Sequence, residues 1–126
     1  MKLSAFLGLA GAIGILFGLE FLLIPELALS QYGVPTEPHN LMQARYFGGT
    51  VFAYGLIYWL ARKSTDDTTR RALLLVGVIG NGIGLVLSLW SRSAGLQGLL
   101  AWLAVGIYAA LLLGSLYFLL RPARRD

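Results

Sequence analysis

The sequence predicts an all-α membrane protein, an antiparallel four-transmembrane-helix bundle. Of its 126 residues, 57% are hydrophobic and 13% are charged, whereas a soluble domain carries about 25% charged residues. Four apolar stretches of 20 residues or more cover most of the chain, and roughly 20 apolar residues are enough to cross a bilayer. Each stretch is expected to be helical because lipid offers no partners for backbone N–H and C=O groups. We therefore predict one membrane domain over residues 1–126.

The four predicted spans cover residues 3–24, 41–61, 72–91 and 96–120. The first contains a single charge, Glu20, the second contains Arg45, and the other two contain none. The first stretch also has features of a signal peptide, because Lys2 precedes it and small residues follow it. Its apolar segment exceeds the usual length of about 7–15 residues, so we interpret it as a retained span.

The connections predict an up-down-up-down arrangement. The first loop, residues 25–40, contains three prolines and a glycine and cannot be one continuous helix. Residues 26–32 are expected to form a short interfacial helix, with Pro25 in its first turn. The second loop, residues 62–71, offers helix caps at 64–67, and residues 92–95 form a tight turn. Short links predict that neighbouring helices pack antiparallel.

The basic residues predict the orientation in the membrane. Eight lie on one predicted side and one, Arg92, lies on the other. Because Lys and Arg accumulate in cytoplasmic segments, both termini and the second loop are expected in the cytoplasm of a bacterium, with the protein in the inner (plasma) membrane. The eight are Lys2, Arg62, Lys63, Arg70, Arg71, Arg121, Arg124 and Arg125.

Small residues recur at four-residue spacing on three of the predicted helices. This spacing lets another backbone approach closely, either within the chain or in a homodimer, and the sequence leaves both open. The sets are Gly14 and Gly18; Gly80 and Gly84; and Gly106, Ala110 and Gly114. Aromatic residues near span ends predict an interfacial belt, formed by Tyr58, Trp59, Trp90, Tyr117 and Phe118. Trp102 lies deeper in its span.

Polar residues inside the predicted spans indicate where function resides, because such groups are costly in lipid unless paired. Glu20 and Arg45 each lie four residues from the outer end of a span, about 6 Å deep, so we expect an ion pair between them. This pair is either a structural clamp or the charged rim of a pocket for an amphipathic, lipid-like ligand. The predicted ligand-binding residues are Glu20, Arg45, Gln43, Tyr46, Gln97 and Asn81.

Enzymatic chemistry has little support in the sequence. With no cysteine and one histidine, His39, thiolate metal sites and disulfides are excluded, and no catalytic motif is present. We therefore expect a non-enzymatic protein without a cofactor, with membrane lipids, a second copy or another membrane protein as its partner. Nucleic acid is not expected as a partner despite the net charge of +4. Two alternatives stay open: a proton-coupled transporter using Glu20, and an accessory subunit of a larger membrane complex.

The stretch Gln43-Ala44-Arg45-Tyr46-Phe47-Gly48-Gly49-Thr50 opens the second predicted span. It resembles a feature of small bacterial four-span families of unknown function, in which an Arg-aromatic-Phe-Gly segment follows a proline-containing loop. The chain is also similar to the four-span scaffold proteins of sterol biosynthesis and, in layout, to DoxX-like proteins. The scaffold resemblance implies a role in holding membrane enzymes or lipids together. The lack of cysteine and redox ligands does not fit an oxidoreductase role of the DoxX type.

Overall fold

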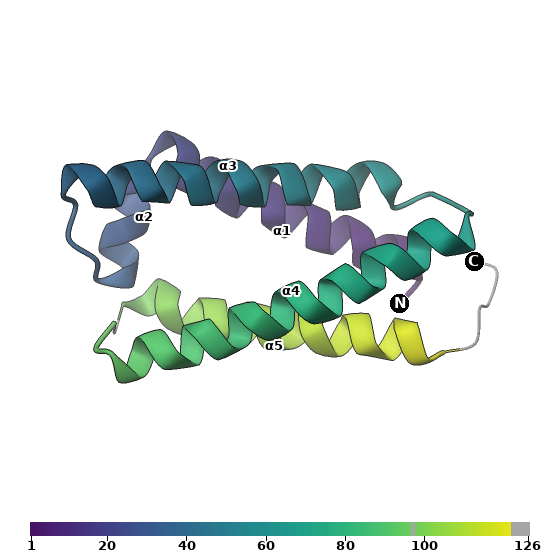
Figure 1. Cartoon of the computed structure of the whole chain (residues 1–126). Helices are drawn as coiled ribbons and strands as arrows, with labels where there is room; N and C mark the ends of the chain where they lie inside the picture. Colours follow the sequence, from purple (N-terminus) through teal and green to yellow (C-terminus); the bar gives the residue numbers. More distant parts are fainter. Residues whose placement is uncertain (97, 122–126) are drawn as a thin grey trace.

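The computed structural model describes residues 1–96 and 98–121, and this part of the chain is all-α (Figure 1). The predicted short helix after the first stretch is confirmed, and the four long helices overlap the four predicted apolar stretches. The elements are α1 (Leu3–Leu23), α2 (Pro25–Tyr32), α3 (Pro38–Ala61), α4 (Asp67–Ser93) and α5 (Leu99–Leu120). The second and third long helices begin three and five residues earlier than predicted, because local signals extend them into polar sequence.

Proline, glycine and aspartate determine where several helices begin and end. Pro25 and Pro38 stand in the first turns of α2 and α3, where proline is tolerated because its missing N–H has no helical partner. Gly33 ends α2 with a positive φ of 72°, which glycine adopts without steric cost. Asp66 caps α4, as predicted for this loop, and its Oδ2 accepts from the Thr69 backbone N–H at 2.7 Å and from the Thr69 hydroxyl at 2.6 Å.

The long helices form two antiparallel pairs, α1 with α3 and α4 with α5, which are the closest helix contacts in the structure (Figure 1). Gly11, Gly14 and Gly18 of α1 lie against the backbone of α3. A Cβ atom at Gly14 would come within 2.8 Å of the Gly55 Cα atom, so the two backbones are in direct contact. The small-residue face of α1 therefore serves packing within the chain.

The second pair also uses glycines, but against side chains. Gly84 of α4 lies under the ring of Tyr108, and Gly77 lies against Ser115, a Cβ atom there meeting Ser115 Oγ at 2.5 Å. Gly106 of α5 has nothing within 4 Å of its added Cβ position. This stretch of α5 therefore remains uncovered by the described residues.

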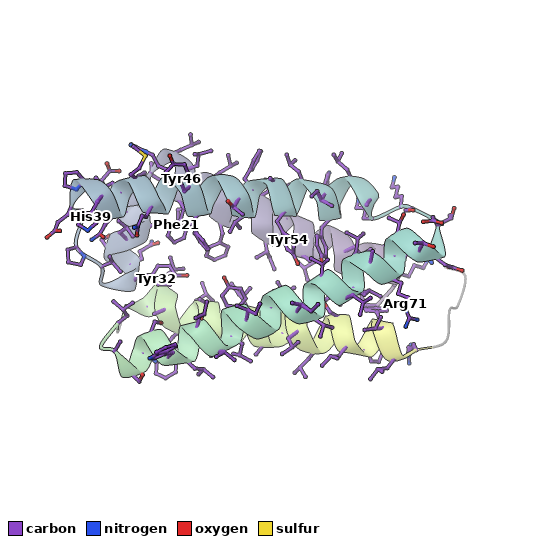
Figure 2. All side chains as sticks on the ribbon, in the orientation of Figure 1. Phe21, Tyr32, His39, Tyr46, Tyr54 and Arg71 are labelled. Carbon is purple, nitrogen blue, oxygen red and sulfur yellow. The ribbon has the colours of Figure 1, made fainter. Side chains whose placement is uncertain are left out.

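One end of the molecule carries most of the described basic residues. Figure 1 places the start of α1, the α3–α4 loop and the end of α5 together at this end. Figure 2 shows Arg71 at this end and His39 at the opposite one, beside α2. We call the two ends the basic end and the α2 end. The described cations of the basic end are Lys2, Arg62, Lys63, Arg70, Arg71 and Arg121.

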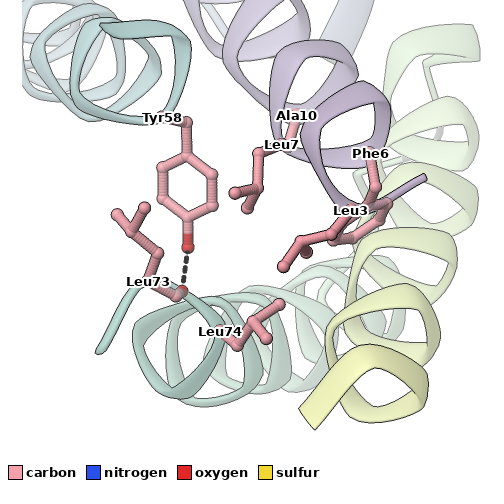
Figure 3. Packing of buried hydrophobic residues seen from close by; sticks show 7 residues of the cluster. All are labelled: Leu3, Phe6, Leu7, Ala10, Tyr58, Leu73 and Leu74. Atoms are coloured by element: carbon pink, nitrogen blue, oxygen red, sulfur yellow. Dashed lines mark hydrogen bonds between the residues drawn. The ribbon is translucent and has the colours of Figure 1, made fainter. Parts of the chain in front are cut away.

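Two clusters of buried side chains form the core, one near each end of the molecule. The cluster near the basic end joins α1, α3 and α4 (Figure 3) and consists of Leu3, Phe6, Leu7, Ala10, Tyr58, Leu73 and Leu74. The cluster at the α2 end consists of Phe21, Ala28, Leu29 and Ala44. Gly98, just before α5, lies against the backbone of Gln31 and Tyr32. The helix α2 therefore bridges the two pairs at its end of the molecule.

Three of the described helices are long and apolar enough to cross a membrane: α1, α4 and α5, with mean hydropathies of 2.1, 2.2 and 2.2. These helices indicate a multi-pass membrane protein. The helix α3 has 24 residues, a length of about 36 Å, but it is less apolar than the others. Arg45 together with several glycines and tyrosines lowers its hydropathy.

Candidate ligand cavity between the helix pairs

A cavity of about 320 Å³ lies between the two helix pairs, and all five helices contribute to its wall. A volume of this size is at the lower end of the range for small-molecule sites, about 300–1,000 Å³. The wall is formed by Ala10, Ile13, Gly14, Phe17, Phe21, Tyr32, Phe47, Thr50, Val51, Tyr54, Gly80, Asn81, Ala104, Ile107, Tyr108 and Leu111. None of these side chains is charged, and most are apolar. The cavity therefore favours an uncharged, mainly apolar occupant.

Aromatic rings form the wall of the cavity at the α2 end. The Phe21 ring lies 5.6 Å from that of Tyr32 and 5.0 Å from that of Phe47, between ring centroids. Figure 2 shows Phe21, Tyr32 and Tyr54 extending into the space between the pairs, whereas Tyr46 extends away from it. The rings form a rigid apolar surface against which a chain or a ring can pack.

A short chain of hydrogen bonds leads from the cavity wall to α4. The Tyr58 hydroxyl donates to the Leu73 carbonyl oxygen at 2.5 Å (Figure 3). The Tyr54 hydroxyl lies 2.9 Å from that of Tyr58 and donates to it. Tyr58 is 2% exposed, so water does not compete for its bond to the Leu73 carbonyl oxygen. The chain fixes Tyr54 in the wall and links α3 to α4, two helices that otherwise barely touch.

Four other polar side chains border the cavity. The Thr50 hydroxyl donates to the Tyr46 carbonyl oxygen at 3.0 Å, and Asn81 Nδ2 donates to the Gly77 carbonyl oxygen at 2.7 Å. The other atom of this amide, Asn81 Oδ1, makes no hydrogen bond to any described residue. Asn81 is only 7% exposed. The hydroxyls of Tyr32 and Tyr108 make none within the described residues either. These free groups are available to an occupant.

The Tyr32 hydroxyl remains a hydrogen-bond donor at physiological pH. Burial raises the pKa of Tyr32, and the nearby Tyr108 and Glu20 raise it further. Because the ordinary tyrosine pKa is already about 10, the phenol stays protonated.

The cavity opens sideways, between the helix pairs. Its exposed wall residues are Phe47, Thr50 and Gly80, on α3 and α4. On the other side, between α1 and α5, lies an apolar groove of about 600 Å³ that shares Ile13, Ile107 and Leu111 with the cavity wall. The cavity is therefore open at its side, between the helices.

The predicted ion pair between Glu20 and Arg45 does not form. Among the described residues an acid–base contact joins His39 Nδ1 and Glu37 Oε2 at 3.9 Å, and it is an ion pair only when the histidine is protonated. The predicted pair rests on the equal depth of the two residues in their spans and takes no account of the direction in which each side chain leaves its helix. Glu20 lies about 120° round α1 from Gly14, which faces α3. Glu20 therefore points away from α3, and it is half-buried near Tyr32. Arg45 is exposed on α3.

The structure does not bring the six predicted ligand-binding residues together. Asn81 alone among them lines the cavity. Gln43 and Tyr46 are exposed on α3, and Tyr46 is 73% exposed. Gln97 lies outside the described residues.

Sequence reasoning missed the tyrosines of the cavity. It assigned Tyr58 to an interfacial belt, which is wrong because the ring is buried and hydrogen-bonded. The spacing of Tyr54 and Tyr58 was the available signal, because residues four apart share one face of a helix. Trp102, predicted to lie deeper, is 56% exposed and stacks under the Arg92 guanidinium, whose Cζ is 3.2 Å from the ring centroid.

The fold and the cavity define a small helical protein of the multi-pass membrane class. Residues 9–125 match a family described as a domain of unknown function, DUF8292. The chain belongs to this family, whose match covers nearly its whole length. Comparison with curated proteins and with solved structures gives no match.

Proposed function

We propose that this protein is a non-enzymatic, four-span protein of the bacterial inner membrane that binds a lipid-like ligand in the cavity between its helix pairs. The observation that carries the proposal is the uncharged, aromatic-walled cavity of about 320 Å³ with lateral openings. The ligand site predicted from the sequence is thereby moved inward, from a charged rim at Glu20 and Arg45 to the space between the pairs.

The proposed topology counts α3 as the fourth span. Its length of 24 residues is sufficient, and its Gly48 and Gly55 backbones contact α1 directly, so it must share the depth of α1 in the bilayer. Basic residues gather at one end of the bundle, which supports a cytoplasmic location for that end and for both termini.

The likeness to four-span scaffold proteins of sterol biosynthesis fits the same proposal at the level of function. A bundle that holds a lipid between two helix pairs needs no reactive group. The likeness to DoxX-like proteins concerns the arrangement of the helices and adds nothing to the proposed function.

The proposal can be tested by a substitution whose side chain blocks the opening between α3 and α4. Thr50→Trp places a large ring at an exposed wall position, and Ala53→Trp places the same ring at an exposed α3 position outside the wall. Each protein is purified in mild detergent, and retained small molecules are measured by native mass spectrometry. We expect the wild type and Ala53→Trp to retain a ligand and Thr50→Trp to lose it. Equal retention by all three would contradict the proposal.

A second candidate function is proton-coupled transport through Glu20. What favours it is that Glu20 has no ion-pair partner among the described residues and lies near the cavity residue Tyr32. Proton flux into liposomes containing the Glu20→Gln variant tests this candidate. Flux equal to that of the wild type would eliminate it.

An accessory or homodimeric role would use the α5 surface around Gly106 and Ala110, because Gly106 has open space beside it. Gly106→Leu should then abolish association, measured as subunit number by native mass spectrometry. Unchanged association would exclude this surface.

A further inference from the structure

We infer that Tyr54 selects a neutral lipid alcohol, whose hydroxyl donates a hydrogen bond to the Tyr54 phenol oxygen. This inference rests on the proposed function, since it names the ligand class of the same cavity. It follows from counting the protons in the hydrogen-bond chain that begins at Tyr54.

A phenol hydroxyl has one proton, and a backbone carbonyl only accepts. The bond between Tyr58 and the Leu73 carbonyl oxygen therefore uses the Tyr58 proton. Tyr58 has none left for Tyr54, so the 2.9 Å bond between the two hydroxyls uses the Tyr54 proton. The Tyr54 oxygen can then act only as an acceptor toward the cavity, and it requires a donor from the ligand.

The surroundings of Tyr54 suit a hydroxyl group. Gly80 leaves space beside it, since a Cβ atom there would still be 3.7 Å from the Tyr54 oxygen. The side-chain oxygen Asn81 Oδ1, which has no partner among the described residues, is a further acceptor in the wall. The Tyr108 hydroxyl is a donor in the same wall. An alcohol both donates and accepts, so it satisfies groups of both kinds.

Charge and shape restrict the rest of the ligand. With no charged side chain in the wall, a carboxylate or an ammonium group would be desolvated without compensation. Along α1 the wall runs from Ala10 to Phe21, about 16 Å at 1.5 Å per residue. At about 30 Å³ for each water-sized group, the cavity holds on the order of ten such groups. A chain of ten carbons is therefore a suitable probe.

The test compares three probes that differ only in their head group: 1-decanol, decyl methyl ether and, at pH 8, decanoate. The ether accepts but cannot donate, and decanoate is charged. Binding to the full-length protein in nanodiscs is measured by isothermal titration calorimetry. We expect 1-decanol to bind about tenfold more tightly than the ether, because an acceptor left unsatisfied in a buried site costs about one decade of affinity or more. Decanoate is expected to bind weakest.

Two variants test the proton count itself. Tyr54→Phe removes the Tyr54 acceptor, so the preference for 1-decanol over the ether should become smaller, with Asn81 Oδ1 as the acceptor that remains. Tyr58→Phe leaves the Tyr54 proton free to donate to the ether oxygen, so the ether should gain about tenfold in affinity. Melting temperatures show whether each variant is folded, and the wild-type series decides the question if one is not.

The outcomes separate the two proposals. Equal binding of 1-decanol and the ether to the wild type would overturn the inference and leave the proposed lipid binding standing. Failure of all three probes to bind the folded wild type would overturn both.

Discussion

The backbone of Gly55 in α3 lies directly against that of Gly14 in α1: a Cβ atom at position 55 would be 2.7 Å from the Gly14 carbonyl carbon and 2.5 Å from the Ile15 nitrogen. Neither neighbour is a flexible side chain that can move aside. The contact makes α1 and α3 one rigid unit, which forms one wall of the cavity, while α4 and α5 form the other.

Gly55→Ala should destabilise the protein by about 1–3 kcal/mol, because the added methyl group overpacks a backbone contact. The measurement is the free energy of unfolding in mixed micelles. Gly49→Ala is the matched control on the same helix, since nothing lies within 4 Å of its added Cβ position. It should be neutral or stabilising by about 0.5–1 kcal/mol, because alanine favours helix. Similar losses in both variants would contradict the close α1–α3 contact.

Stability at acid pH should depend on the cap of α4. The Thr69 hydroxyl, followed by the Thr69 backbone N–H, lowers the pKa of Asp66. A lowered folded pKa stabilises the protein above the unfolded value of about 3.9, and this stabilisation is lost as the pH falls through the folded pKa. The melting temperature of the wild type should therefore fall below about pH 4.

Asp66→Asn keeps a capping side chain that does not titrate. The fall in melting temperature below about pH 4, here called the acid limb, should therefore be smaller in this variant. Asp67→Asn is the control, because the Asp67 carboxylate makes no hydrogen bond to any described residue. This variant should keep the acid limb of the wild type. An acid limb in Asp66→Asn as steep as that of the wild type would show that the cap does not cause it.

The contact of Arg92 with the Trp102 ring should couple the two residues energetically. A cation at 3.2 Å from the centroid is well within the range of about 6 Å for cation–π attraction, which contributes about 0.5–2 kcal/mol. A double-mutant cycle with Arg92→Gln and Trp102→Leu should give a coupling of that size in unfolding free energy. The cycle of Arg92→Gln with Trp90→Leu, at a ring that is 69% exposed, should give none.

Single cysteines can test whether α3 crosses the membrane, because the natural chain contains none. Thr36→Cys lies before α3 and Thr65→Cys lies after it, both at exposed loop positions. A membrane-impermeant maleimide added to intact spheroplasts should label position 36 and not position 65. Replacing Arg62, Lys63, Arg70 and Arg71 with glutamine should weaken or reverse this difference. Labelling of both positions in the unaltered background would exclude the four-span topology.

The helices were predictable from the sequence because their signals are local. Length and apolarity predict the long helices, Pro25 predicts the start of α2, and the capping residues at 64–67 predict the cap at Asp66. Hydropathy does not predict that α3 and α4 begin before their apolar stretches. Only the part of a helix inside the bilayer must be apolar, and the helix can continue into polar sequence outside it. The packing role of Gly14 and Gly18 followed from their spacing, although their partner did not.

The candidate site was less predictable because it depends on directions and distances between helices. The sequence predicts equal depth for Glu20 and Arg45, but the direction of each side chain around its helix depends on which face of α1 packs against α3, and the glycines of α1 determine that face. The cavity exists because the two pairs touch near their ends and remain apart between them, which no single helix encodes. Asn81 was identified because a buried amide in a span is conspicuous, whereas Tyr54 resembled any aromatic residue of a membrane helix.

The central claim is that the space between the helix pairs holds a lipid-like molecule. A density map at side-chain resolution, from protein purified in nanodiscs of its native lipids, tests it most directly. We expect elongated density between Phe17, Tyr54 and Ile107, with a polar end within hydrogen-bond distance of the Tyr54 oxygen. A map in which α1 and α3 close onto α4 and α5, with their side chains filling this space, would contradict the account.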